Sequence, residues 1–148
     1  MLTKKTKYAI HALTFLAKEH GDRPLKDAVP VVIGIISKDV KIPRKFLEII
    51  LLELKNEGIL NSKMGKGGGY FLTKKPASIK LSKLIRMFNG PIALLPCASK
   101  NYYEKCKECP DEIACGLHSI AIQVRDETLV LLEKLSIQDI LFREVNNA

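Results

Sequence analysis

Four cysteines and one histidine between residues 97 and 118 are the side chains of this sequence best suited to bind a metal. They are Cys97, Cys106, Cys109, Cys115 and His118. Cys106-x2-Cys109 and Cys115-x2-His118 each place two ligands at a spacing that one metal ion can bridge. The same thiols can react with oxidants, since a thiol switch needs only two neighbouring cysteines. The segment is therefore the predicted site of metal binding or redox chemistry.

Three chemistries are compatible with this segment. Zinc modules usually separate their two ligand pairs by about 12 residues or more, whereas five residues separate the pairs here. An iron–sulfur cluster accepts thiolates from a loop and tolerates a histidine ligand, which raises its reduction potential. A metal-free pair of thiols is the third alternative. The spacing alone leaves all three open.

An enzyme built around the same thiols is the main rival to a sensing role. Such an enzyme needs an acid or a base close to its nucleophile, together with a pocket. The sequence has three histidines, His11, His20 and His118, and only His118 lies near a cysteine. A structural zinc module is a second rival, but it would not require a basic, glycine-rich hairpin. We therefore predict that the chain is not an enzyme.

Positive charge is concentrated in the N-terminal half. Residues 1–80 hold 16 Lys and Arg against 7 Asp and Glu, for a net charge of +9, whereas residues 81–148 hold 8 against 9, for −1. Such asymmetry favours a nucleic-acid partner. A membrane partner is disfavoured because there is no apolar run of about 18 residues and no signal peptide. We expect a cytoplasmic protein whose cysteines are reduced.

Capping and breaking residues divide the N-terminal half into three helices and two strands. Thr3 can cap a first helix, which Gly21 ends, and Pro43 suits the first position of a third helix. The second helix is almost entirely apolar in its first half, which predicts that it is buried. The expected helices cover residues 3–20, 31–40 and 43–58, and the expected strands cover 59–63 and 70–74.

The C-terminal half is predicted to be helical except for the segment that carries most of the cysteines. Helices are expected over residues 79–88, 115–135 and 137–145, with irregular structure over 92–114. The long helix keeps one stripe, apolar except for Thr128, at three- and four-residue steps, namely Leu117, Ile120, Ala121, Val124, Thr128, Leu131 and Leu135. At about 28–30 Å this helix would extend beyond a small domain. Its stripe could pack on its own chain, but the overhang favours a homodimer.

The run from Gly65 to Gly69 between the two expected strands predicts a tight turn. Glycines allow the positive φ angles of such a turn and a close approach of backbone amides to phosphate. The run is not a dinucleotide fingerprint, because Tyr70 follows it and no Gly-Lys-Ser/Thr sequence occurs. A helix followed by a basic hairpin instead predicts a winged helix-turn-helix that binds DNA.

Basic residues accompany each part of this predicted DNA-binding unit. A helix in the major groove contacts base edges with its N-terminal residues, while lysines elsewhere neutralise phosphates. The candidate residues are Lys4 and Lys5 at the first helix, Lys41, Arg44 and Lys45 at the third, and Lys63, Lys66 and Gly67 in the hairpin. Each lysine alone would be an ordinary solvated residue. Together they predict a surface for double-stranded DNA.

Three segments resemble a known group of proteins. The stretches 2–10 (LTKKTKYAI), 42–48 (IPRKFLE) and 65–72 (GKGGGYFL) look like the bacterial Rrf-type (Rrf-two) transcription regulators. This family includes the iron–sulfur cluster regulator, the nitric-oxide-sensing repressor and the cysteine-metabolism repressor. The resemblance covers nearly the whole chain and implies a sequence-specific transcriptional regulator, with repression the expected mode.

The resemblance also implies an architecture. The expected fold is mainly α with a small β wing, in which a long C-terminal helix joins two copies of the chain. Residues 1–78 would form the DNA-binding domain, 79–114 the connecting helix and cysteine loop, and 115–148 the dimerisation part. Lys45 and Glu48 fall where family members read bases. Met64 stands where the iron–sulfur regulator has a wing arginine, which leaves the target sequence open.

Cluster-binding members of the family have three cysteines separated by five residues each, with a histidine three residues after the last. Cys109, Cys115 and His118 match the end of this pattern, and Cys97 or Cys106 would supply the first ligand. A [2Fe–2S] cluster is expected rather than [4Fe–4S]. Lys7 stands where the nitric-oxide-sensing type has an aspartate, which argues against that subtype. The alternative is a cluster-free regulator of the cysteine-metabolism type.

Overall fold

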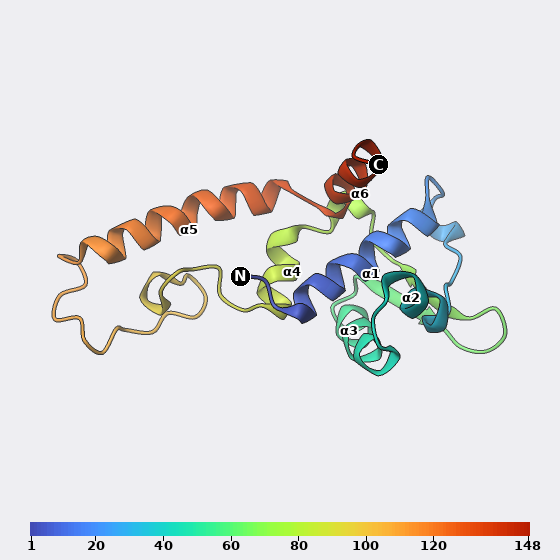
Figure 1. The fold of residues 1–148 in the computed structure, drawn as a ribbon, viewed down its shortest axis with the longest axis horizontal. Coiled ribbons are helices and arrows are strands. Elements are labelled where there is room, and N and C mark those ends of the chain that lie inside the picture. The colour runs from blue at the N-terminus through green and yellow to red at the C-terminus, as the bar shows by residue number, and fades with distance from the viewer.

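A head and an arm make up the computed structural model, which describes residues 1–148 (Figure 1). The head consists of α1–α4, the two strands and α6, and the arm consists of α5 together with residues 89–115. The helices are α1 (Lys4–His20), α2 (Ile33–Val40), α3 (Arg44–Asn56), α4 (Leu81–Phe88), α5 (Gly116–Lys134) and α6 (Ile137–Asn146), and the strands are β1 (Leu60–Lys63) and β2 (Gly69–Leu72). The mainly helical fold with one small sheet agrees with the prediction.

α1 is the central helix of the head, and it begins and ends as its sequence predicts. The Oγ1 atom of Thr3 accepts a hydrogen bond from the backbone N–H of Thr6 at 3.1 Å. Gly21 ends the helix with φ of 61°. This N-cap stabilises the helix by about 1 kcal/mol.

The core of the head is a single cluster of aliphatic side chains from five helices and the sheet. Leu and Ile predominate because their burial stabilises the fold by about 1.5–3 kcal/mol for each side chain. Its fully buried members include Leu13, Ile36, Leu47, Ile50, Leu51, Leu54, Leu60, Leu72, Leu84 and Ile137. Because Ile137 belongs to α6, the chain returns to the head after the arm and packs against α1.

α2 is shorter and more exposed than its sequence predicts. The expected helix over residues 31–40 begins only at Ile33, because Val31 pairs with Tyr70 through two backbone hydrogen bonds of 2.8 Å. Only Ile36 of this helix is buried, whereas Ile35 remains 55% exposed. The prediction of a buried helix was therefore wrong. Val31, the first residue of the apolar run, extends the sheet. The rest of the run forms α2, which buries only one of its faces.

The two strands form an antiparallel hairpin, which we call the wing. Leu60 is paired with Leu72 at its base, and Lys63 with Gly69 at its end. The turn depends on glycine: Gly65 and Gly67 have φ of 84° and 72°, which L-residues rarely adopt. In Figure 1 the wing projects from the head on the side away from the arm.

The arm is joined to the head by a short antiparallel bridge between Lys80 and Ser136. The N–H of Leu81 donates to the carbonyl of Leu135 at 3.0 Å, and the N–H of Ile137 donates to the carbonyl of Ile79 at 3.1 Å. The end of α5 is thus fixed beside the start of α4.

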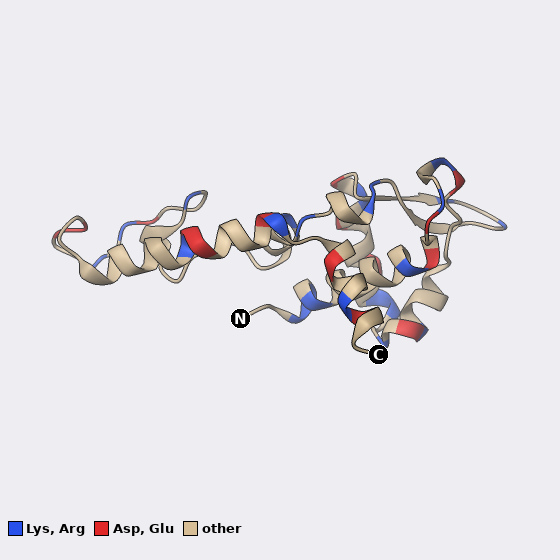
Figure 2. Cartoon of the chain, turned by 90° about the horizontal axis from the view of Figure 1, so that it is seen from above, with Lys and Arg blue, Asp and Glu red and all other residues tan.

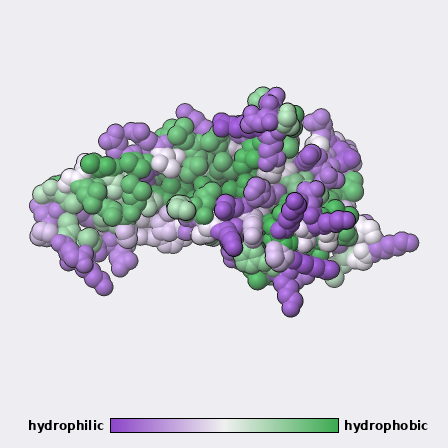
Figure 3. All heavy atoms as spheres, in the orientation of Figure 1, coloured by the Kyte–Doolittle hydropathy of each residue, from purple (hydrophilic) through white to green (hydrophobic).

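α5 extends from this bridge to the cysteine segment at the far end of the arm (Figure 1). Its 19 residues span about 28 Å. Ala121 and Leu129 are buried, but Leu117, Ile120 and Leu131 are 61%, 58% and 61% exposed. Apolar surface covers much of the arm (Figure 3). No helix of the chain combines the length and apolarity needed to cross a membrane.

Candidate nucleic-acid interface and metal centre

α3 presents a charged face because its other face is held in the core. Leu47 and Ile50 are fully buried and Phe46 packs against the core, so the residues on the opposite side of the helix face outward. Arg44, Lys45 and Glu48 are all exposed. Arg44 Nε lies 3.4 Å from Glu48 Oε1, an ion pair along the helix surface. Glu48 thereby orients a cation at the helix N-terminus.

The turn between α2 and α3 is stabilised by its own hydrogen bonds. Lys41 adopts the left-handed conformation with φ of 55°. The hydroxyl of Ser37 donates to the carbonyl of Ile42 at 2.6 Å, while Ile42 N–H donates back to the carbonyl of Ser37 at 3.2 Å. This pair of bonds fixes where α3 begins. The exposed Lys41 side chain lies next to that beginning.

The predicted wing residues lie along the hairpin. Lys63 ends β1, and Lys66 and Gly67 belong to the turn, where all three are exposed. Lys/Arg colouring marks the projecting end of this hairpin (Figure 2). The structure thus brings the wing lysines together in one projecting element, which contacts the C-terminal end of α3 through a hydrogen bond of 2.7 Å from Lys55 Nζ to Ser62 Oγ.

Lys4 and Lys5 at the start of α1 have different surroundings. Lys4 is exposed. Lys5 Nζ donates to Glu53 Oε1 on α3 and lies 5.6 Å from the centre of the Phe88 ring. Lys5 therefore links α1 to α3, and Glu53 competes with any phosphate for its charge.

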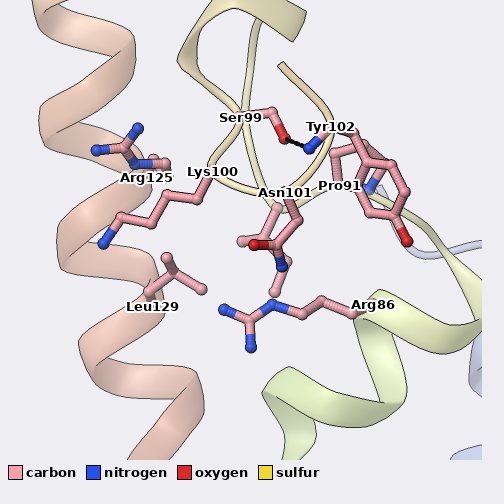
Figure 4. A pocket seen from close by; sticks show the side chains of 9 residues that line it. Arg86, Pro91, Ser99, Lys100, Asn101, Tyr102, Arg125 and Leu129 are labelled. Atoms are coloured by element: carbon pink, nitrogen blue, oxygen red, sulfur yellow. Dashed lines mark hydrogen bonds between the residues drawn. The ribbon is translucent and has the colours of Figure 1, made fainter.

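Residues 91–102, at the start of the cysteine segment, surround a small polar pocket together with α4 and α5 (Figure 4). Three cations line it, and each has an acidic partner on α5. The ion pairs are Arg86–Glu133 (3.8 Å), Lys100–Asp126 (3.4 Å) and Arg125–Asp126 (2.8 Å). Ser99 Oγ accepts the backbone N–H of Tyr102 at 3.0 Å. The loop is held against α5 by Lys100–Asp126 and by a hydrogen bond of 2.6 Å that Arg125 Nη1 donates to the carbonyl of Ala98.

The structure brings Cys97 and His118 together although 21 positions separate them in sequence. Cys97 Sγ lies 3.4 Å from His118 Nδ1, and Glu112 Oε1 lies 3.9 Å from the same nitrogen. Ligand atoms of the three residues all lie within 4.8 Å of one another. Burial, and then the negative charge of Glu112, raise the pKa of the Cys97 thiol.

The other three cysteines lie on the remainder of the loop. Cys109 and Cys115 are half-buried and Cys106 is exposed. Burial, followed by the charge of Cys115 and a hydrogen bond with it, raises the pKa of Cys109. All four cysteines are reduced thiols in the structure. Cys97 thus lies beside His118, while the Cys109 thiol interacts with that of Cys115.

Sequence reasoning missed Glu112 and Tyr103. The Tyr103 hydroxyl donates to both carboxylate oxygens of Glu112, at 3.1 and 3.0 Å, and this interaction raises the Tyr103 pKa. Glu112 lies in an acidic Asp-Glu pair within a loop, a pattern that is common on protein surfaces. No spacing in the sequence indicates that its carboxylate faces His118.

The sequence matches one protein-family model over residues 2–143. This family is Rrf2, described as an iron-dependent transcriptional regulator.

Individual proteins also resemble the chain over most of its length. A protein of Rhodobacter capsulatus named as an rrf2-like HTH-type transcriptional regulator is 40% identical over 95% of this chain and 92% of its own. The HTH-type transcriptional regulator IscR of Escherichia coli is 25% identical over 95% of this chain and 79% of its own. The structure of CymR, the global cysteine regulator of Bacillus subtilis, has a TM-score of 0.74 at 23% identity and covers 97% of both chains. That last similarity concerns the fold.

Proposed function

This chain belongs to the Rrf2 family of transcriptional regulators, and from that premise we propose how its parts divide the work. Residues 1–78 bind double-stranded DNA, residues 79–114 connect this domain to the cysteine segment, and residues 115–148 make the dimer contact. In this proposal α3 enters the major groove and the wing contacts the phosphate backbone. Because its proposed partner is DNA, we propose that the protein acts in the cytoplasm. Its proposed effect on transcription is repression.

One observation carries this proposal: α3 is anchored on one face and charged on the other. Leu47, Ile50 and Leu51 are fully buried, so the helix is rigidly attached to the head. Lys45 and Glu48 are exposed near its N-terminal end. Lysine and arginine side chains bind guanine acceptors, and a glutamate accepts from cytosine N4. This end of α3 is therefore suited to read base edges.

The exposed stripe of α5 supports a homodimer. Leu117, Ile120 and Leu131 lie on one side of a helix that extends beyond the head, and each is more than half exposed. Apolar residues at this spacing are typical of helices that pack against a partner helix. A second copy of the same helix would cover the stripe. Two heads in a dimer would then contact successive half-sites, whose spacing is set by DNA geometry.

The cysteine segment supports a sensing role, and its donor set fits an iron–sulfur cluster. Cys97 with His118 and Cys109 with Cys115 offer two pairs of donors, and a cluster of the [2Fe–2S] type takes two protein ligands on each iron. When bound, such a cluster supplies sensitivity to electrons, oxygen and iron supply. Cys106 is exposed and is the alternative first thiol ligand.

A second candidate function, a thiol switch without metal, is favoured by the contact between Cys109 and Cys115. In this candidate, oxidation of the two thiols to a disulfide would pass two electrons to an oxidant and release two protons. In both candidates, a change at the far end of the arm would alter the relative positions of the two heads and hence their affinity for DNA.

The test begins with selection of duplexes from a random-sequence library by the purified reduced protein. Binding of the selected duplex is then measured by fluorescence anisotropy. We expect Lys45→Ala to lose at least tenfold in affinity, because it removes a base-reading cation. Lys107→Ala is the matched control, since this exposed lysine lies on the cysteine loop. Equal binding of the selected duplex and a scrambled one would refute sequence-specific binding.

The sensing role has a separate test. Cys115→Ser and Cys109→Ser should bind the selected duplex equally under reducing and oxidising conditions, whereas the unmodified protein should differ between them. An anaerobic visible spectrum and an iron assay distinguish the cluster from the thiol switch. If the unmodified protein binds DNA identically under all these conditions, the sensing role is wrong.

A further inference from the structure

We infer that Cys97, Glu112 and His118 form a mononuclear binding site for a divalent transition-metal ion, Zn²⁺ or Fe²⁺, in the protein without a cluster. The proposed cluster would use Cys97 and His118 but not Glu112. The inference therefore concerns a second state of the same end of the arm. It stands independently of DNA binding, since none of the three residues belongs to the head.

The distances between the donor atoms are close to those of ligands around one small ion. Zinc bonds of about 2.0–2.3 Å in a tetrahedral arrangement place neighbouring donor atoms about 3.3–3.7 Å apart. Cys97 Sγ and His118 Nδ1 are 3.4 Å apart, and His118 Nδ1 and Glu112 Oε1 are 3.9 Å apart. A small movement of the Glu112 side chain would complete the geometry.

A hydrogen bond accounts for the contact between Cys97 and His118 but not for the approach of Glu112. The 3.9 Å between Glu112 and His118 is too long for a hydrogen bond. Glu112 therefore approaches the Cys97–His118 pair without a hydrogen bond to either residue, although its carboxylate lies within 4.8 Å of the buried Cys97 sulfur. A bound divalent ion would bring all three donors to one centre.

The donor types restrict the metal. A thiolate, an imidazole and a carboxylate together suit borderline ions such as Zn²⁺ and Fe²⁺, whereas Mg²⁺ and Ca²⁺ require oxygen ligands. Three protein ligands leave a fourth position for water, as in zinc sites that exchange a ligand. The site is thus suited to reversible binding.

Three structural elements hold the donors in place. Cys97 lies in a 3-10 turn (Pro96–Ala98) that packs against α5, and His118 lies in the first turn of α5. Glu112 is oriented by the Tyr103 hydroxyl, which donates to both of its oxygens. Such outer hydrogen bonds fix the orientation of a metal ligand. The site is therefore largely formed before the metal arrives, and only the Glu112 side chain has to move.

The test uses Co²⁺ as a probe for the full-length protein, reduced and freed of metal and cluster under anaerobic conditions. A thiolate-bound tetrahedral Co²⁺ gives visible absorption, so its binding can be titrated directly. We expect one equivalent to bind per chain. Glu112→Gln should weaken binding at least tenfold, and Cys97→Ser and His118→Ala should abolish the thiolate spectrum. Lys107→Ala, at an exposed position of the same loop, is the matched control and should bind normally.

Two further arms complete the test. Displacement of Co²⁺ by Zn²⁺ or by Fe²⁺ determines which ion the site prefers. Cys109→Ser should retain Co²⁺ binding while losing the visible absorption of a reconstituted cluster, which separates this site from the proposed cluster. Normal Co²⁺ binding by Glu112→Gln, or its loss in Cys109→Ser, would overturn the inference. DNA binding by the metal-free protein is measured separately, so neither result depends on it.

Discussion

Gly69 of the wing lies so close to Val31 that no other residue fits. A Cβ atom at position 69 would stand 2.4 Å from both the carbonyl carbon and the carbonyl oxygen of Val31. Gly69 also has φ of 139°. This close approach lets Val31 pair with Tyr70, so the segment before α2 and the wing are fixed to each other.

We predict that Gly69→Ala destabilises the protein by about 2 kcal/mol or more, through the combined clash and backbone strain. Unfolding in urea measures the change. Gly34→Ala is the matched control, because Gly34 lies in α2 with no neighbour within 4 Å of a Cβ atom. It should stabilise the protein by roughly 0.5–1 kcal/mol. Equal stability of Gly69→Ala and the unmodified protein would contradict the close packing.

Lys66 at the tip of the wing is expected to contact a phosphate. Replacing it by alanine should weaken binding to all duplexes by a similar factor. The slope of log K against log salt should fall in magnitude by about 0.9, the value for one phosphate contact. Anisotropy titrations at several salt concentrations measure this slope. Lys107→Ala should leave it unchanged, and an unchanged slope for Lys66→Ala would remove the wing tip from the interface.

Ile120 on α5 is expected to lie in the dimer contact. Ile120→Glu would place a charge in an apolar interface and should convert the dimer to monomers. Sedimentation velocity measures the oligomeric state. Ser119→Glu introduces the same charge at an exposed position away from the stripe and should preserve the dimer. A dimer that tolerates Ile120→Glu would require a different contact surface.

Asp139 should make stability depend on pH. Its carboxylate accepts from Ser136 Oγ and Ser136 N–H at 2.6 and 2.8 Å, and these bonds lower its pKa in the folded state. The lowered pKa contributes stability that is present above the unfolded-state value, near 3.9, and is lost as the pH falls through the folded-state pKa.

Asp139→Ala should therefore be less stable than the unmodified protein at pH 7, and this difference should shrink as the pH falls below about 4. Thermal unfolding across this pH range tests it. Gln138→Ala, at an exposed neighbouring position, should show no such pH dependence. A constant difference for Asp139→Ala would mean that the charge of Asp139 does not stabilise the helix.

The fold could be predicted where local signals agree with one another. Thr3, Gly21 and Gly58 indicate helix ends through capping and positive φ, and all three act where expected. Val31 was misassigned to a helix because a short apolar run fits a helix or a strand equally well. Only the distant Tyr70 decides between them.

The metal-ligand candidates were predictable by residue type but not by grouping. Cys97 stands far from the other thiols in sequence, yet the loop folds back along α5 and places it beside His118. Glu112 had no distinguishing signal because carboxylates are frequent on surfaces. Periodicity likewise predicts the apolar stripe of α5. It does not predict that Ala121 is buried within its own chain while Ile120 stays exposed.

The bridge between Lys80 and Ser136 has a mechanical consequence. Because Leu135, which follows α5, is bonded to the first residue of α4 and is separated from α6 by a single residue, a displacement of the end of α5 would also move α4 and α6. A rotation of α5 at its cysteine end would therefore also turn the head. The arm would therefore change the orientation of the head, in addition to linking it to the cysteine segment.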